Sequence, residues 1–77
     1  MATVEQIKAA RALLAWSQED LAAHSHVSLP TVRRFEARSK LRVSTETRVK
    51  MEAALEAAGI EFTNGDAPGV RLHQRSD

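Results

Sequence analysis

Apolar residues recur every three or four positions through most of the chain up to Ala58, a spacing that places them on one face of an α-helix. The first such stretch follows Thr3, which begins a capping box with Gln6, and continues to about Leu14. Ser17 is typical of the N-cap of a second helix, because acidic residues follow it in the first turn. The pattern predicts that this second helix ends near residue 24.

A third, short helix is expected directly afterwards. Ser28 is a further N-cap residue, and Pro30 falls in the first turn of a helix, where proline is tolerated, so residues 25–28 must form a tight turn. On a helical wheel, Val32 and Phe35 lie together on one side. The opposite side carries Pro30, Arg33, Arg34 and Ala37. The pattern therefore predicts a helix over 29–37 that exposes two arginines.

The segment 38–43 has neither a helical nor a strand period, so we expect an exposed loop there. Ser44 then caps a fourth helix. Gly59, in a left-handed conformation, is expected to end it. The apolar stripe of this helix contains Met51, Ala54, Leu55 and Ala58, widened by Val49 and Ala53.

An alternation of apolar and polar residues replaces the helical period after Gly59. It runs over 60–63 and again over 70–73, and the residues between are rich in turn formers. We expect a β-hairpin here and frayed residues over 74–77. The chain is thus expected to divide into a helical domain over 1–59 and a C-terminal strand or hairpin extension over 60–77.

Charge is distributed unevenly, although the net charge is only +1. Seven basic and two acidic residues lie between Arg33 and Lys50, which makes this stretch +5 and the remainder −4. A solvated loop explains an isolated basic run equally well. The two arginines on the exposed side of the third helix favour a nucleic-acid-binding surface, because helices joined by so short a turn form a helix-turn-helix whose second helix fits the major groove.

The composition excludes several classes of protein. There is no cysteine, so disulfides, thiolate metal sites and thiol nucleophiles are unavailable. No apolar run approaches the roughly 20 residues of a membrane-spanning helix. Glu5 and Gln6 interrupt what would have to be the apolar part of a signal peptide. We therefore expect a soluble cytoplasmic protein.

The stretches from Ala9 to Ala22 and from Val27 to Glu36 resemble the Cro and phage-repressor superfamily of helix-turn-helix domains, also called the xenobiotic-response-element family. The most specific parts are the Ser-Gln-Glu-Asp-Leu-Ala run over 17–22 and the Phe35-Glu36 pair, and the resemblance covers roughly Thr3 to Gly59. It implies a mainly α fold, a phage-repressor-like domain of four to five helices with a short C-terminal β-hairpin or strand. It also implies a transcriptional regulator that binds double-stranded DNA in the bacterial nucleoid.

The resemblance carries DNA-contacting roles to individual positions. The residues that it places against bases are Leu29, Pro30, Arg33 and Arg34. Those that it places against phosphates or flanking DNA are Ser17, Gln18, Ser28 and Thr31, together with Arg38, Lys40 and Arg42 in the loop beside the backbone. It also pairs Arg11 with Glu36, as a structural link between the first helix and the end of the third.

This sequence departs from the family pattern at three positions. His26 stands in the turn where glycine is common, so either a bulky residue sits at positive φ or the turn differs slightly in shape. Glycine is also commoner where this chain has Arg38, at the end of the third helix. Arg48 replaces an apolar residue that is often found in the fourth helix, which predicts a thin core.

A lone reading helix covers too few base pairs to be specific, so such proteins bind palindromic operators as dimers with half-sites about 34 Å apart. No fifth helix follows Gly59, and an isolated hairpin is only marginally stable. We therefore expect a homodimer joined by two hairpins or two edge strands, with apolar contacts from Leu55, Ile60, Phe62, Val70 and Leu72. The alternative is that the hairpin folds over its own core.

Other functions have weaker support in the sequence. His24, His26 and His73 lack the spacing of a metal site, and no catalytic motif or cofactor-binding loop is recognised, so we expect neither a metal, nor a cofactor, nor an enzyme. The main alternative is an antitoxin-type protein that binds the same kind of DNA and neutralises a partner toxin. A protein-interaction module that has lost DNA binding is a second alternative.

Overall fold

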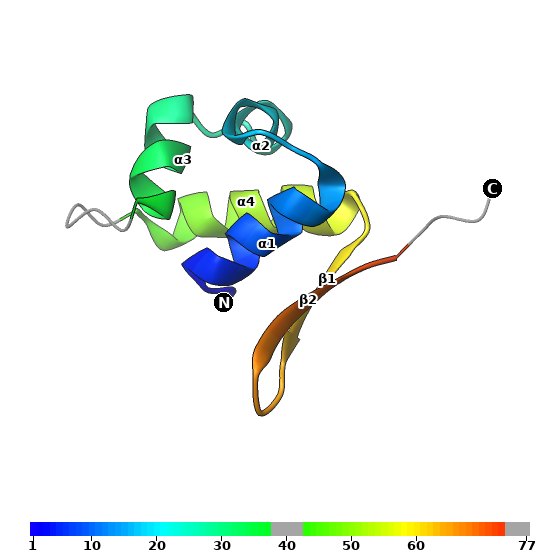
Figure 1. Ribbon diagram of the computed structural model, residues 1–77. Coiled ribbons are helices and arrows are strands. Elements are labelled where there is room, and N and C mark those ends of the chain that lie inside the picture. Colours follow the sequence, from blue (N-terminus) through cyan, green and yellow to red (C-terminus); the bar gives the residue numbers. More distant parts are fainter. Residues whose placement is uncertain (38–42, 74–77) are drawn as a thin grey trace.

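The computed structural model describes residues 1–37 and 43–73, which form a helical body followed by a β-hairpin (Figure 1). The helices are α1 (Val4–Leu14), α2 (Gln18–Ser25), α3 (Leu29–Glu36) and α4 (Thr45–Ala57), and the strands are β1 (Ile60–Asn64) and β2 (Pro68–Leu72). The expected mainly α fold with a C-terminal hairpin is confirmed, with four helices in the described part of the chain.

Each helix begins at the cap residue that the sequence predicted. The side chains of Thr3, Ser17, Ser28 and Ser44 each accept a hydrogen bond from a backbone N–H in the first turn of the helix that follows. At α1 and α2 the reciprocal bond of a capping box is also present. These caps satisfy N–H groups that have no partner within the helix, and they fix where each helix starts.

Three residues adopt a left-handed backbone conformation, and each of them follows the end of a helix. Ala15 has φ 56° after α1, and His26 has φ 59° after α2, which is the first of the two alternatives for the turn. Gly59 follows α4 with φ 106°, and a Cβ atom there would lie 2.8 Å from the carbonyl oxygen of His73. Only glycine fits this third position, because the backbone that follows β2 approaches it so closely.

The core lies between the four helices and the start of β1. Its fully buried large side chains are Ile7, Leu21, Val32, Met51 and Leu55. Val49 and Ala53 do not widen the α4 stripe as expected, because Ala53 is exposed and Val49 is 51% exposed. The guanidinium of Arg48 lies over the ring of Phe35, 5.4 Å from its centre, and donates to the carbonyl of Ala2. The arginine therefore covers the core with its side chain instead of leaving it thin.

Two of the expected dimer contacts belong to this core. Leu55 is 0% exposed and Ile60 is 4% exposed, so neither can reach a second copy without unfolding of the protomer. The prediction was wrong for these two residues because an apolar residue facing a core and one facing an interface have the same signature in a sequence. Phe62, Val70 and Leu72 are partly buried and pack against the core from the hairpin.

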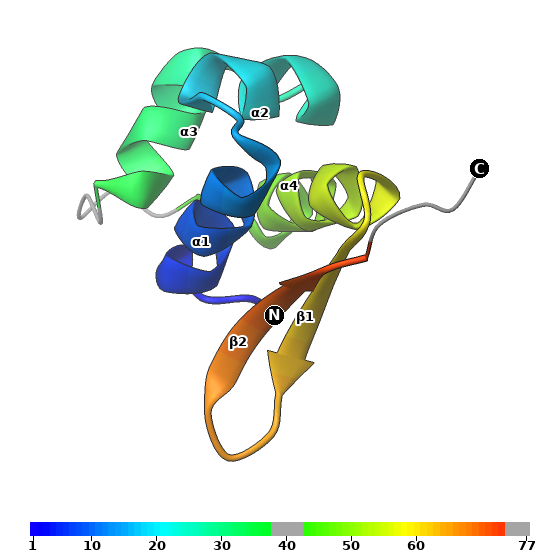
Figure 2. The same cartoon turned by 45° about the vertical axis from the view of Figure 1, so that its right-hand side comes forward.

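The hairpin pairs β1 with β2 in antiparallel register, with Phe62 opposite Val70. It projects from the helical body on the side away from α2 and α3, and β2 lies nearer to α1 than β1 does (Figure 2). Gln6 anchors it: this buried amide donates to the carbonyls of Thr63 and Gly69 at 3.0 and 2.9 Å. The hairpin therefore packs against its own helical body, as the alternative expected, through Ile60 at its base and through the bonds of Gln6 near its tip. Within the described ranges, no helix is both long and apolar enough to cross a membrane.

Candidate nucleic-acid interface

α2 and α3 are joined by a turn of the kind that the sequence predicted. The N–H of Val27 donates to the carbonyl of Ala22 at 3.2 Å, which closes the end of α2. Val27 and Val32 flank the cap residue Ser28, and both are buried. This hydrophobic pair fixes the direction in which the chain enters α3, and with it the position of the exposed side of that helix.

The two sides of α3 differ in burial as expected. Val32, Phe35 and Glu36 face inward and are buried. The outward side carries the residues proposed to face bases: Pro30, Arg33 and Arg34 are exposed, and Leu29, at the start of the helix, is half-buried. In the described part of the chain, neither arginine takes part in a salt bridge. α3 thus presents two uncompensated cations on an open surface.

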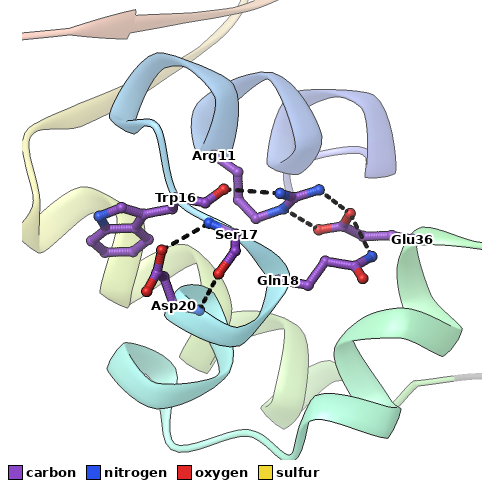
Figure 3. A network of polar contacts seen from close by, with 6 residues as sticks. All are labelled: Arg11, Trp16, Ser17, Gln18, Asp20 and Glu36. Atoms are coloured by element: carbon purple, nitrogen blue, oxygen red, sulfur yellow. Dashed lines mark hydrogen bonds and ion pairs between the residues drawn. The ribbon is translucent and has the colours of Figure 1, made fainter.

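A polar network holds α1, α2 and α3 together behind this surface (Figure 3). Arg11 donates to both carboxylate oxygens of Glu36, through Nε at 2.7 Å and Nη2 at 2.5 Å, so the expected pair is formed. Its Nη1 donates to the carbonyl of Trp16 at 3.0 Å. Gln18 donates from Nε2 to the same carboxylate at 3.2 Å. Glu36 therefore fixes the amide of Gln18 with its Nε2 toward the protein, and leaves the Oε1 of that amide without a bond to the described residues.

The start of α2 is held by a second pair of hydrogen bonds. Ser17 Oγ accepts from the N–H of Asp20 at 3.0 Å, and the Asp20 carboxylate accepts from the N–H of Ser17 at 2.9 Å. Hydrogen bonding from Ser17 to the Asp20 carboxylate, first from its backbone N–H and then from its hydroxyl, holds the pKa of Asp20 below its usual value.

At the start of α3, Ser28 and Thr31 contact each other. Their hydroxyl oxygens are 2.7 Å apart, and both lie at the surface end of the helix. One hydroxyl hydrogen is used between them, so the pair keeps one donor for an outside acceptor. Both residues stand beside the exposed side of α3, as expected for contacts to phosphates flanking the bases.

Two contacts were not predicted from the sequence, one beside α2 and one at the hairpin. The rings of Trp16 and His24 stack with their centres 4.2 Å apart and an interplanar angle of 7°. Trp16 precedes α2 and His24 lies near its end, and no helical period relates residues on both sides of a helix start. Gln6 was predicted only as a capping residue. Its burial and its bonds to the hairpin depend on a segment more than fifty residues away.

The remaining expected contacts cannot be placed. Arg38, Lys40 and Arg42 lie outside the described residues. Among residues 1–37 and 43–73, no cluster of three or more acidic or histidine side chains could hold a metal ion.

The sequence model of a family described as helix-turn-helix matches residues 7–59, which is more than half of the chain and contains most of α1 and all of α2 to α4. No curated protein matches the chain.

Proposed function

The chain belongs to the helix-turn-helix family of the Cro and C1 type, and from this membership we propose that it is a sequence-specific regulator that reads the major groove with α3. The family is one of DNA-binding transcription regulators and not of enzymes. The proposal for this chain is more specific: it binds a palindromic operator as a homodimer, in the cytoplasm and associated with the bacterial nucleoid.

The observation that carries the proposal is the contrast between the two sides of α3. Val32 is 0% exposed and Phe35 is 7% exposed, so the helix is anchored by its inner side. Arg33 and Arg34 extend from the outer side into solvent. An arginine on a firmly held helix is suited to bidentate pairing with O6 and N7 of guanine. Leu29 and Pro30 add apolar surface that suits the methyl group of thymine.

Phosphate contacts fix the orientation of such a helix in the groove. We propose that these come from polar side chains around α2 and the start of α3: Ser17, Gln18, Ser28 and Thr31. The hydrogen that the Ser28 and Thr31 hydroxyls keep, and the second Nε2 hydrogen of Gln18, are donors that suit phosphate oxygens and so support this role. The basic residues Arg38, Lys40 and Arg42 complete the set by their place in the sequence, between α3 and α4.

We propose that residues 1–59 bind DNA and that the extension over 60–77 joins two copies. The side chains available for this are Phe62, Val70 and Leu72, which are only partly buried in the protomer. The hairpin projects on the side away from α3 (Figure 1), so a contact made through it leaves α3 free.

The test is selection of bound sequences from a random pool of double-stranded DNA, followed by footprinting of the selected site. We expect a twofold-symmetric site whose half-sites are separated by about one helical turn, roughly 34 Å. An asymmetric site would contradict the homodimer, and the absence of any enriched sequence would contradict sequence-specific binding.

A further inference from the structure

The outer edge of β1 has backbone groups that are free to pair with another strand. The N–H of His73 donates to the carbonyl of Gly59 at 2.8 Å, which makes these two residues a hydrogen-bonded pair at the base of the hairpin. Hydrogen-bonded and non-hydrogen-bonded pairs alternate along an antiparallel ladder. In the observed register, Ile60, Phe62 and Asn64 therefore direct their N–H and C=O groups outward from β1. In the described part of the chain, no backbone hydrogen bond is made by these outward groups.

The outer edge of β2 is less suited to pairing. Pro68 faces Asn64 across the hairpin and occupies an outward position, but proline has no N–H to donate. Proline within a sheet is confined to edge strands, strand starts and bulges. This edge also borders a groove of about 380 Å³ beside α1, so the helix stands next to it. These features identify β2 as the strand whose edge stays unpaired.

Burial limits the usable part of β1. Ile60 is 4% exposed, so its outward groups are covered by the protomer itself. Phe62 and Thr63 are partly exposed and Asn64 is fully exposed. A second strand can therefore lie against β1 only from Phe62 to the tip.

We propose that β1 pairs antiparallel with β1 of a second copy, with Thr63 opposite Thr63 at the twofold axis, so that two hairpins form one four-stranded sheet. This inference rests on the homodimer of the proposed function and specifies its interface. In this register Phe62 of each copy pairs with Asn64 of the other, and each of the two pairs makes two hydrogen bonds. The Thr63 side chains face each other across the axis, a cross-strand pair that is favourable.

Neighbouring registers are worse for definite reasons. With Phe62 at the axis, Asn64 would face the covered Ile60, and only the bonds of the central pair would form. With Glu61 at the axis, two carboxylates would lie directly opposite each other, and Phe62 would face Ile60. Of these three registers, only the one with Thr63 at the axis pairs open groups with open groups and opposes no like charges. A shift by one residue toward the tip, with Asn64 at the axis, would place Phe62 opposite Asp66, which lies in the turn beyond β1.

The experiment is sedimentation velocity without DNA on the full chain carrying Thr63→Lys or Thr63→Glu, with Ala67→Lys in the hairpin turn as a charge-matched control. Each Thr63 variant places like charges at the axis, so we expect its dimer to dissociate about tenfold more readily than that of the unmodified chain, whereas the control stays dimeric. An equal mixture of the two Thr63 variants should recover the dimer, because a lysine of one copy then faces a glutamate of the other at the axis. Recovery on mixing also demonstrates that both variants are folded.

Other outcomes overturn the proposal. A Thr63→Lys protein that dimerises more tightly would indicate the register with Phe62 at the axis, because the introduced lysine then lies opposite Glu61 of the second copy. Unchanged dimerisation of both variants would mean that β1 is not the contact.

A second variant keeps the proposal testable if the Thr63 variants do not fold. Asn64→Pro removes one outward N–H that the hairpin does not use, and undiminished dimerisation of that variant contradicts the pairing. DNA binding by the unmodified chain is measured separately, so failure of this interface is distinguishable from failure of the proposed function.

Discussion

Arg11 and Glu36 are twenty-five positions apart and satisfy each other almost completely behind α3. The Glu36 side chain is 3% exposed and that of Arg11 is 18% exposed, so this pair is largely removed from water. The desolvation of a buried pair offsets much of its attraction, and a buried carboxylate left without its partner is strongly destabilising. The pair therefore matters most as a requirement for keeping α1, α2 and α3 in one arrangement.

We predict that Arg11→Met lowers the free energy of unfolding by about 3 kcal/mol, because it leaves the Glu36 carboxylate buried without its main partner. Chemical denaturation measures this loss. The double variant Arg11→Met with Glu36→Leu is the control, and it should recover most of the loss because no buried charge remains. If the single variant is as stable as the unmodified chain, the pair carries no such role.

Asp20, at the start of α2, makes the stability of the protein depend on pH. Its pKa in the folded protein lies below the ordinary 3.8, because the N–H and then the hydroxyl of Ser17 favour the carboxylate. A depressed folded pKa stabilises the protein above pH 3.8, and this contribution is lost as the pH falls through the folded pKa.

We therefore predict that Asp20→Ala lowers the melting temperature at about pH 7, and that its difference from the unmodified chain narrows below pH 3.8. Thermal unfolding between these pH values and about pH 2 measures the effect. Asp20→Asn keeps an acceptor oxygen without the titration, so its own melting temperature should fall less steeply with acid than that of the unmodified chain. A difference between Asp20→Ala and the unmodified chain that stays constant throughout this range would contradict this account.

At the scale of elements, the sequence encodes local structure more fully than long-range contacts. The starts of all four helices and the existence of the hairpin were predictable, because capping residues and turn formers act on backbone groups a few positions away. The assignment of Leu55 and Ile60 to an interface was wrong, since periodicity indicates only that an apolar side chain is covered. Gln6 against the hairpin and Arg48 over Phe35 were not predictable, because each depends on how separate elements pack.

The hairpin is part of the folded body and not a detachable appendage. Ile60 contributes its side chain to the core, so we predict that Ile60→Ala destabilises the protein by about 2 to 5 kcal/mol. Truncation after Gly59 removes this residue as well, and should yield an unfolded chain instead of the folded monomer that a pure dimerisation element would leave. Circular dichroism measures the helical content and the thermal stability of both variants. Leu72→Ala, at a partly buried position, is the control. A folded truncated chain would contradict this role.

The segment between α3 and α4 is expected to act through charge alone. We predict that replacing Arg38, Lys40 or Arg42 with alanine weakens binding to all DNA sequences alike and lowers the slope of affinity against salt concentration by about one for each phosphate that is no longer neutralised. Titrations at several salt concentrations measure this. Glu46→Ala in the first turn of α4 is a control that should not lower the slope. If the slope is unchanged in all three variants, this segment is an ordinary solvated loop that does not contact phosphates.

For the whole molecule, the arrangement separates two tasks. α3 with its exposed arginines lies on one side of the helical body and the hairpin leaves on the other (Figure 2). Joining two copies through the hairpin tethers a second α3, which raises the affinity for a double site by an effective-concentration effect often of about 100-fold or more. The same tether gives little advantage on a single half-site.

The central claim is that α3 reads bases, and the affinity of Arg34→Ala for the selected operator and for unrelated DNA tests it most directly. Arg71→Ala, which removes an exposed arginine from β2, is the matched control. We predict that Arg34→Ala loses about 1 to 3 kcal/mol of binding free energy on the operator while its weak binding to unrelated DNA is largely retained, and that Arg71→Ala changes neither. Arg33→Ala is expected to behave in the same way as Arg34→Ala if both arginines face bases. An equal loss on both DNAs would mean that Arg34 contacts only the backbone, and it would contradict the assignment of this residue to base reading.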